Sequence, residues 1–252
     1  MTRQQTWGNH VETGGAPLLV TGASGGIGRE IVLRLACQGS KLALTGRSRE
    51  RLDALAQEAS EVGASVIVLP ANLEEPGVPE RLVSEVVRWG GGVRGVISCA
   101  GGGRFTFFSR LSKEEFDAAI RLNLLAPIDL VRAALPYLIE HPRSWAIFVN
   151  TIAAREPAPP RGSAYLAAKA GLIHFAEAFF AEIRDRGVTV SSILPDLTDT
   201  ALVPESLGYD RYTLIRPSSV ADAVLFAMTS SPDVCITELH LRPQPSLRKA
   251  SS

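Results

Sequence analysis

Tyr165 and Lys169 are the residues whose types and spacing most directly indicate chemistry in this sequence. They stand four residues apart in a segment with a helical pattern of apolar residues, so a phenol and an ammonium share one face of a helix. A lysine beside the phenol stabilises the phenolate, and we expect it to lower the tyrosine pKa from its usual value of about 10 toward neutrality. A tyrosine tuned in this way can exchange a proton with a carbonyl oxygen while hydride moves at the carbon. Many helices carry such a pair by chance, so the rest of the sequence decides what it means.

A glycine-rich segment near the N-terminus, TGASGGIGREIVLRLA, has the spacing of a dinucleotide-binding loop. Gly22, Gly26 and Gly28 follow an apolar run of strand length and precede an amphipathic helix. Glycine is needed where the chain turns sharply and its backbone approaches a phosphate, and the helix N-terminus offers free N–H groups to that phosphate. A turn that serves only packing of helix on strand is the alternative, and the strand–loop–helix context favours the nucleotide site.

Arg47 indicates which dinucleotide this loop would hold. The second predicted strand ends in Thr45-Gly46-Arg47-Ser48, where a site for NAD usually places an acid on the ribose 2′-hydroxyl. No acid stands there, and the planar guanidinium suits a 2′-phosphate. A solvated surface arginine at the start of the next helix is the alternative. The sequence therefore predicts NADP(H) as the cofactor.

Apolar runs of strand length alternate with longer helical patterns along most of the chain. This alternation predicts an α/β fold with a doubly wound, parallel, seven-stranded sheet flanked by helices. The near-continuous apolar strands fit a sheet that is covered on both faces. The predicted strands are 17–21, 41–45, 65–69, 94–98, 145–150, 188–194 and 235–241, and the predicted helices lie near 26–38, 48–62, 76–89, 112–140, 163–186 and 218–230.

No internal repeat and no linker divides the chain, so we predict one domain over residues 16–243. The polar residues 1–15 and the residues 244–252 are predicted to be tails. Residues 203–217 hold two prolines and no clear period, which is typical of a long loop, and we expect this loop to act as a lid over a site.

Composition argues against several classes of function. Lysine plus arginine and aspartate plus glutamate each number 26, and no basic run stands out, so we expect neither a nucleic-acid nor a membrane partner. The three cysteines and four histidines lack metal-ligand spacing, so no metal is assigned. The N-terminus has no apolar stretch typical of a secretory signal, and no apolar run reaches membrane-spanning length, so we expect a cytoplasmic protein.

The glycine loop and the Tyr165–Lys169 pair together resemble the NADP-preferring branch of the short-chain dehydrogenase/reductase family over residues 16–243. The resemblance implies a single-domain Rossmann fold, and it extends to RLNLLAP, which contains Asn123, and to TELHLRP near the end. In that family the matching asparagine bends its helix and holds a water near the lysine, and the lysine also holds the nicotinamide ribose. Catalytic roles are thereby implied for Tyr165, Lys169 and Asn123, and a homodimer or homotetramer for the assembly. The cofactor contacts expected by the same resemblance are at Gly22, Ser24, Gly26, Ile27, Gly28, Arg47, Asn72, Leu73, Cys99, Ala100, Gly101, Tyr165, Lys169, Pro195, Thr198 and Thr200.

Three segments depart from the family's pattern. Ser98-Cys99-Ala100-Gly101 stands where Asn-Asn-Ala-Gly is common, so the asparagine contacts that rigidify this loop are missing. Asn72 replaces the usual aspartate, although its amide oxygen can still accept a hydrogen bond from adenine. The segment PDLTDT puts Asp196 where a small residue is common.

The largest departure concerns the family's substrate-orienting serine, twelve or thirteen residues before the tyrosine. Ala153 and Ile152 occupy those positions, and Thr151 stands one position further back, so these three are the predicted substrate contacts. A donor aimed at a developing oxyanion is worth roughly 3–4 kcal/mol in another enzyme class. Three alternatives follow. Thr151 or Ser163 could supply a hydroxyl; the substrate could bring its own polar group or be activated enough to need only Tyr165; or the protein could bind cofactor and substrate without efficient turnover.

The sequence thus predicts an NADPH-dependent oxidoreductase that interconverts a carbonyl and an alcohol of a small-molecule substrate, with Tyr165 as general acid/base. A cofactor-binding regulatory protein with impaired catalysis is the alternative, as is an enzyme of this fold with non-redox chemistry. Arg104 and Arg155 are candidates to meet an anionic group. The expected pocket is lined by the loop after Gly101, by residues 152–161 and by residues 196–217. Phe105, Phe107 and Phe108 make the first of these apolar, with packing in the core beneath the loop as the alternative.

Overall fold

Seven parallel strands in the order β3-β2-β1-β4-β5-β6-β7 form the centre of this computed structural model, which describes residues 11, 13–157, 160–203 and 210–244. The prediction of a doubly wound, seven-stranded parallel sheet is confirmed. The strands are β1 (Leu18–Thr21), β2 (Lys41–Gly46), β3 (Ser65–Pro70), β4 (Gly95–Ser98), β5 (Ser144–Val149), β6 (Val188–Pro195) and β7 (Glu238–Leu241).

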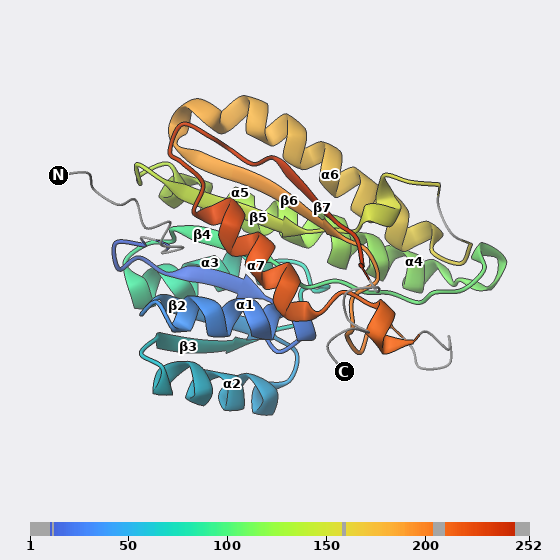
Figure 1. Cartoon of the computed structure of the whole chain (residues 1–252), viewed down its shortest axis with the longest axis horizontal. Coiled ribbons are helices and arrows are strands. Elements are labelled where there is room, and N and C mark those ends of the chain that lie inside the picture. The colour runs from blue at the N-terminus through green and yellow to red at the C-terminus, as the bar shows by residue number, and fades with distance from the viewer. Residues whose placement is uncertain (1–10, 12, 158–159, 204–209, 245–252) are drawn as a thin grey trace.

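Helices cover both faces of the sheet (Figure 1). Apolar side chains of α1, α2 and α7 form one buried cluster against the sheet, and those of α3, α5 and α6 form another on the opposite face. This two-sided cover explains why β1, β4, β5 and β6 are buried along their whole length. The helices are α1 (Gly26–Ala36), α2 (Arg49–Glu61), α3 (Val78–Gly90), α4 (Lys113–Ile120), α5 (Ala126–Leu138), α6 (Ser163–Ile183) and α7 (Pro217–Met228).

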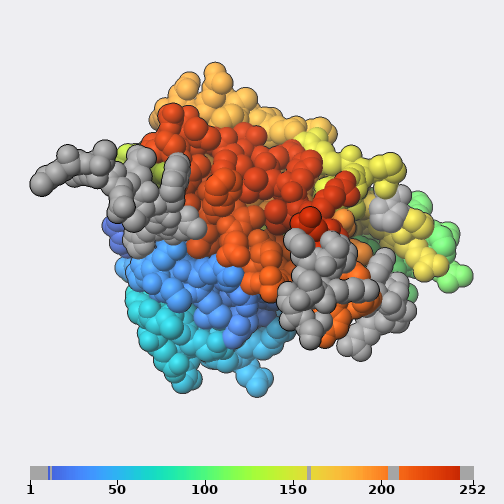
Figure 2. Space-filling view, in the orientation of Figure 1, coloured from blue at the N-terminus to red at the C-terminus, as the bar shows by residue number. Residues whose placement is uncertain are grey.

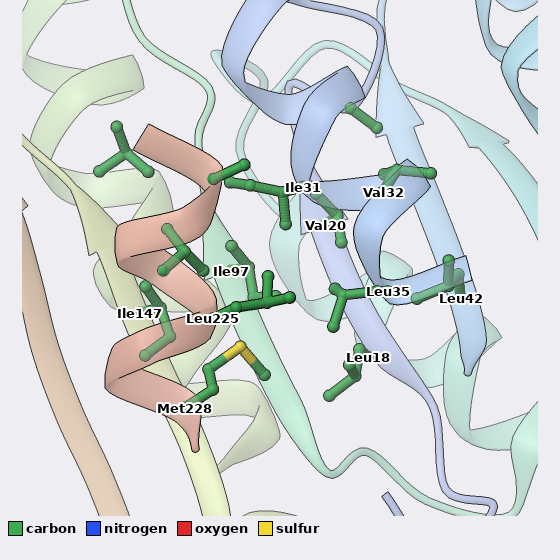
Figure 3. Packing of buried hydrophobic residues seen from close by; sticks show 14 of the residues in the cluster. Leu18, Val20, Ile31, Val32, Leu35, Leu42, Ile97, Ile147, Leu225 and Met228 are labelled. Carbon is green, nitrogen blue, oxygen red and sulfur yellow. The ribbon is translucent and has the colours of Figure 1, made fainter. Parts of the chain in front are cut away.

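Helices α1 and α7 pack side by side, although they lie far apart in the sequence. Figure 3 shows Leu225 and Met228 of α7 directed toward Leu35 of α1, and all three side chains belong to one buried cluster. The space-filling view shows the same contact from outside, with orange C-terminal residues against blue N-terminal ones (Figure 2). The C-terminal part of the chain thus holds in place the helix that begins at the glycine loop.

The structure differs from the predicted elements in three places. The predicted helix 112–140 is divided into α4 and α5 by a π-helical turn, Arg121–Leu125. The last strand begins at Glu238 rather than at residue 235. Val11 and Thr13, which lie in the predicted N-terminal tail, are buried, and the Val11 N–H donates to Gln38 Oε1 at 2.8 Å. Residues 1–10 and 12 of that tail and residues 245–252 of the C-terminal tail lie outside the described residues, as do residues 204–209 of the predicted lid.

The neighbouring strands β1 and β4 are followed by helices on opposite faces of the sheet, which makes their carboxyl ends the topological switch point. Doubly wound sheets bind ligands in the crevice outside that point. The glycine loop follows β1 and the Cys99 segment follows β4, so both predicted segments meet there. Among the described residues, no helix combines the length and the apolar character needed to cross a membrane.

Candidate active site

A cavity of about 300 Å³ opens at the switch point of the sheet. Eight predicted cofactor contacts line it: Gly22, Ser24, Arg47, Asn72, Leu73, Cys99, Ala100 and Gly101. The sequence did not single out the other lining residues, which are Gly25, Gly46, Ser48, Arg51, Ala71, Glu74 and Leu122. The structure therefore brings together residues from four separate segments that follow β1, β2, β3 and β4.

The glycine loop is packed so tightly that side chains are excluded at two positions. Gly22 has a φ of +61°, and a Cβ there would lie 2.8 Å from the Ala100 nitrogen. A Cβ on Gly28 would lie 2.3 Å from the Gly22 carbonyl oxygen. Helix α1 begins at Gly26 with no side-chain cap, so its first N–H groups are free to bind an anion. This geometry favours a phosphate cradle over a simple packing turn.

Two arginines, Arg47 and Arg51, lie at the end of the cavity beyond β2. The Ser48 hydroxyl accepts from the Arg51 backbone N–H at 3.3 Å and caps α2. The Arg51 guanidinium donates to the Ser24 carbonyl at 2.5 Å, which joins α2 to the glycine loop. The sequence carries no direct signal for Arg51, because Arg47 precedes the helix and the spacing of the two arginines is not a helical one.

Eight predicted cofactor contacts lie outside the lining of this cavity: Gly26, Ile27, Gly28, Tyr165, Lys169, Pro195, Thr198 and Thr200. The buried Thr198 hydroxyl donates to the Asp196 carbonyl at 2.9 Å. The Thr200 methyl group lies 2.8 Å from the place where a Cβ on Gly26 would stand, so Thr200 packs against the start of α1. Asn72, the predicted contact to adenine, lies in the cavity lining. Its side-chain oxygen accepts from the Glu74 N–H at 3.2 Å and keeps a second lone pair for a further hydrogen bond.

Thr21 and Asn123 hold the loop after β4, for which the family's asparagine contacts are missing. The Thr21 hydroxyl accepts from the N–H groups of Cys99 and Ala100 at 3.2 and 3.1 Å. The fully buried Asn123 binds both backbone groups of Gly102: its oxygen accepts from the N–H at 3.0 Å and its amide donates to the carbonyl at 2.7 Å. The amide also donates to the Ala119 carbonyl at 2.8 Å, within the π-helical bend. Asn123 therefore anchors this loop, and its role in a water relay stays a prediction.

Lys169 and Tyr165 share one face of α6, as their spacing predicts, but their electrostatics differ from the expectation. The buried Lys169 ammonium donates to the Val149 carbonyl at 2.8 Å, and burial lowers its pKa to about 8. Burial raises the pKa of Tyr165 to about 12. The expectation of a lowered tyrosine pKa is therefore wrong for this structure, because desolvation of the phenol outweighs the charge of an ammonium that is directed at a carbonyl.

We expect Lys169→Met to remove a pH dependence of stability. The pKa of Lys169 falls from 10.5 to about 8 on folding, so above pH 8 the unfolded state binds more protons and the free energy of unfolding rises with pH. As the pH approaches and passes 9, the Cys99 thiol opposes this rise, because desolvation on folding raises its pKa from 9.0 to about 12. Urea unfolding between pH 8 and 9 should therefore show a positive slope of the free energy of unfolding against pH in the parent and in the surface control Lys113→Met, and no positive slope in Lys169→Met. Equal slopes in all three proteins would contradict the assignment.

The positions of the family's serine carry no hydroxyl, and the two nearby hydroxyls, of Thr151 and Ser163, are placed differently. Ile152 is buried with Ile173 and Leu194, and the Thr151 hydroxyl accepts from the Ala153 N–H at 3.4 Å in a short 3₁₀ turn. Ser163 stands two residues before Tyr165, which places it on a different face of α6. Neither Ile152 nor Ala153 therefore offers a side-chain hydroxyl to a substrate near Tyr165.

The three phenylalanines predicted to line one pocket belong to two places. A second, largely apolar cavity of about 500 Å³ is lined by Phe107 and Phe108, together with Ser163, Leu166, Ala167 and Ala170 of α6, on the helix face away from Tyr165. Phe105 alone packs against Tyr165, with the ring centroids 5.3 Å apart. The two candidate arginines are already paired, Arg104 with Glu115, and Arg155 with Glu177 and Glu238.

Known proteins resemble this chain in both sequence and structure. The family model described as short chain dehydrogenase matches residues 17–207. A protein of Staphylococcus aureus (strain MW2), described as an uncharacterized oxidoreductase, is 31% identical over 225 residues, which are 89% of this chain and 96% of that relative. The solved alcohol dehydrogenase from the archaeon Thermococcus sibiricus, complexed with 5-hydroxy-NADP, is 29% identical with a TM-score of 0.82 and covers 90% of this chain and 96% of its own. A solved short chain dehydrogenase from Burkholderia cenocepacia J2315, in complex with NADP, is 26% identical with a TM-score of 0.84, over 92% of this chain and 98% of its own.

Proposed function

Because this chain belongs to the short-chain dehydrogenase/reductase family, we propose that it is an NADPH-dependent oxidoreductase that interconverts a carbonyl and an alcohol. One observation carries the proposal. Tyr165 and Lys169 lie on one helix face, and a Cβ on Gly101, a residue of the nucleotide cavity, would lie 3.4 Å from Lys169 Nζ. A proton donor and a dinucleotide site thus adjoin, which a hydride-transfer reaction requires.

The residues of the cavity fit NADP(H). The glycine cradle, which a Cβ at Gly22 or Gly28 would fill, and the uncapped start of α1 suit the pyrophosphate. Arg47, with no acid beside it at the end of β2, suits a 2′-phosphate. The solved relatives from Thermococcus sibiricus and Burkholderia cenocepacia, complexed with 5-hydroxy-NADP and NADP, support the same assignment. When bound, this cofactor supplies or accepts the hydride.

The chain's own residues supply the proton and the electrostatics. In the direction of reduction, the Tyr165 hydroxyl donates its proton to the carbonyl oxygen as negative charge develops there. The raised pKa keeps this hydroxyl protonated at neutral pH. The Lys169 ammonium lies nearby and stabilises the tyrosinate that remains, because the low dielectric of the buried site strengthens their attraction.

Arg47→Ala is expected to weaken NADPH binding by about tenfold to a hundredfold, the range of a lost charge-assisted contact. NADH lacks the 2′-phosphate, so its Kd should stay the same. Fluorescence titration of both nucleotides measures the difference, and Arg49→Ala is the matched control, because Arg49 starts α2 outside the cavity. Equal weakening of NADPH and NADH in Arg47→Ala would contradict recognition of the 2′-phosphate.

Consumption of NADPH over a panel of ketones, aldehydes and quinones tests the proposal. Carbonyl-dependent oxidation of NADPH with matching alcohol formation is the expected result. NADPH binding without turnover across the panel would favour the alternative of a cofactor-binding regulatory protein. Conversion of a substrate with NADPH unchanged would favour non-redox chemistry.

We further propose self-association into a dimer or tetramer. The exposed apolar side chain of Leu125 in the π turn supports this proposal.

A further inference from the structure

The ring of Phe105 packs against the ring of Tyr165, a contact that the Tyr165–Lys169 spacing does not predict. Phe105 lies in the loop between β4 and α4, and its ring meets that of Tyr165 edge to face, at 5.3 Å between centroids and 61° between planes. The Phe105 side chain remains 45% exposed, so part of the ring is open to a bound molecule. Aromatic pairs of this geometry contribute attraction beyond the area that they bury.

The loop that carries Phe105 is fixed on both sides. Asn123 binds the N–H and carbonyl of Gly102 three residues before it, and Arg104 pairs with Glu115 of α4 at 2.5 Å. The ring also lies close to Gly162 at the start of α6, since a Cβ there would be in ordinary contact with Phe105 Cδ1 at 3.9 Å. The aromatic ring is therefore held in place before any substrate binds.

The surroundings of this ring are largely apolar, and the neighbouring charged side chain, Arg104, is paired with Glu115. Leu202 is exposed and approaches the same loop, because a Cβ on Gly102 would lie 3.5 Å from its Cδ1. The two arginines that could have met an anion, Arg104 and Arg155, are engaged by carboxylates. At the position of the missing serine, Ile152 offers only carbon. A substrate near Tyr165 is thus oriented by apolar contact rather than by a serine hydroxyl.

We propose that Phe105 is a specificity-determining residue that selects neutral substrates with an aromatic ring next to the reacting carbonyl. The inference rests on the proposed carbonyl reduction. In that step the C=O π bond breaks, the carbon gains a hydride from NADPH and the oxygen gains the proton of Tyr165. The aryl ketone is reduced to an alcohol while NADPH is oxidised to NADP⁺. The exposed part of Phe105 packs against the aryl ring and holds the carbonyl at the tyrosine hydroxyl.

A matched pair of ketones tests this role: acetophenone and cyclohexyl methyl ketone have the same skeleton and differ in aromaticity. We would measure kcat/KM and the Kd of each ketone for the NADP⁺-bound protein, in the parent, Phe105→Leu and Phe107→Leu. Phe107 is the control because its exposure, 47%, matches that of Phe105, and it lines the other cavity. For each protein we divide the kcat/KM for acetophenone by the kcat/KM for cyclohexyl methyl ketone. The intrinsic reactivities of the two ketones cancel when this ratio is compared between proteins.

Phe105→Leu is expected to lower this ratio by about threefold to tenfold, the range of one aromatic pair, and Phe107→Leu to leave it unchanged. A ratio unchanged by Phe105→Leu, an equal fall in Phe107→Leu, or a parent that binds neither ketone would overturn the inference. If the parent binds both ketones without turnover, the proposed reduction fails, and the ratio of Kd values still decides the role of Phe105. An unchanged Kd for NADP⁺ in both variants shows that they remain folded at the cofactor site.

Discussion

Tyr165→Phe should reduce turnover of NADPH with any accepted carbonyl by about a thousandfold, within the range expected for loss of a general acid. Phenylalanine keeps the ring that packs against Phe105 and removes only the hydroxyl, which has no hydrogen-bond partner among the described residues. The Kd for NADPH and the melting temperature should therefore stay close to those of the parent. Steady-state kinetics and nucleotide titration on the same preparation measure both effects.

Tyr137→Phe is the matched control, because it removes a phenolic hydroxyl from α5, which lies outside both cavities. Its turnover should equal that of the parent. Retention of a tenth or more of the activity in Tyr165→Phe would assign the proton to water or to another group. Ile152 and Ala153 have no hydroxyl that could take over the role of the lost tyrosine hydroxyl.

The parts of the molecule that the sequence predicted correctly depend on local pattern. Apolar runs of strand length predicted the seven strands, because strands covered on both faces must be apolar throughout. The glycine loop was recognisable because Gly22 and Gly28 stand where the backbone of neighbouring residues approaches too closely for a side chain. These signals lie within a few residues of the feature that they predict.

The parts that the sequence did not predict depend on contacts between distant segments. Thr21 holds the loop after β4 from a neighbouring strand, and Arg51 reaches the glycine loop from α2. The direction of the Tyr165 pKa was predicted incorrectly, because spacing places Lys169 on the right face but does not reveal that its ammonium donates to Val149. The division of the three phenylalanines between two sites likewise depends on how the loop folds over α6.

Gly28→Ala is expected to weaken NADPH binding by more than about a hundredfold, as two or more hydrogen bonds to phosphate are lost, and to lower the free energy of unfolding by about 1–3 kcal/mol. The added Cβ would stand 2.3 Å from the Gly22 oxygen and 3.0 Å from the Ala23 Cα, and both neighbours are backbone. Relief requires the start of α1 to move away from the loop, which turns its free N–H groups away from the pyrophosphate. Nucleotide titration and urea unfolding measure the two losses.

Gly92→Ala separates this effect from the general consequence of adding a methyl group. Gly92 has no positive φ that would strain alanine, and its added Cβ would have only His141 Nε2 near it, at 4.0 Å. Its NADPH affinity should match that of the parent. If Gly28→Ala lost stability but kept its affinity for NADPH, α1 could move without losing the phosphate, and the tight contact at Gly28 would serve packing alone. If the free energy of NADPH binding falls far more than the free energy of unfolding, the close approach of Gly28 to Gly22 serves mainly to direct the N-terminus of α1 toward the cofactor.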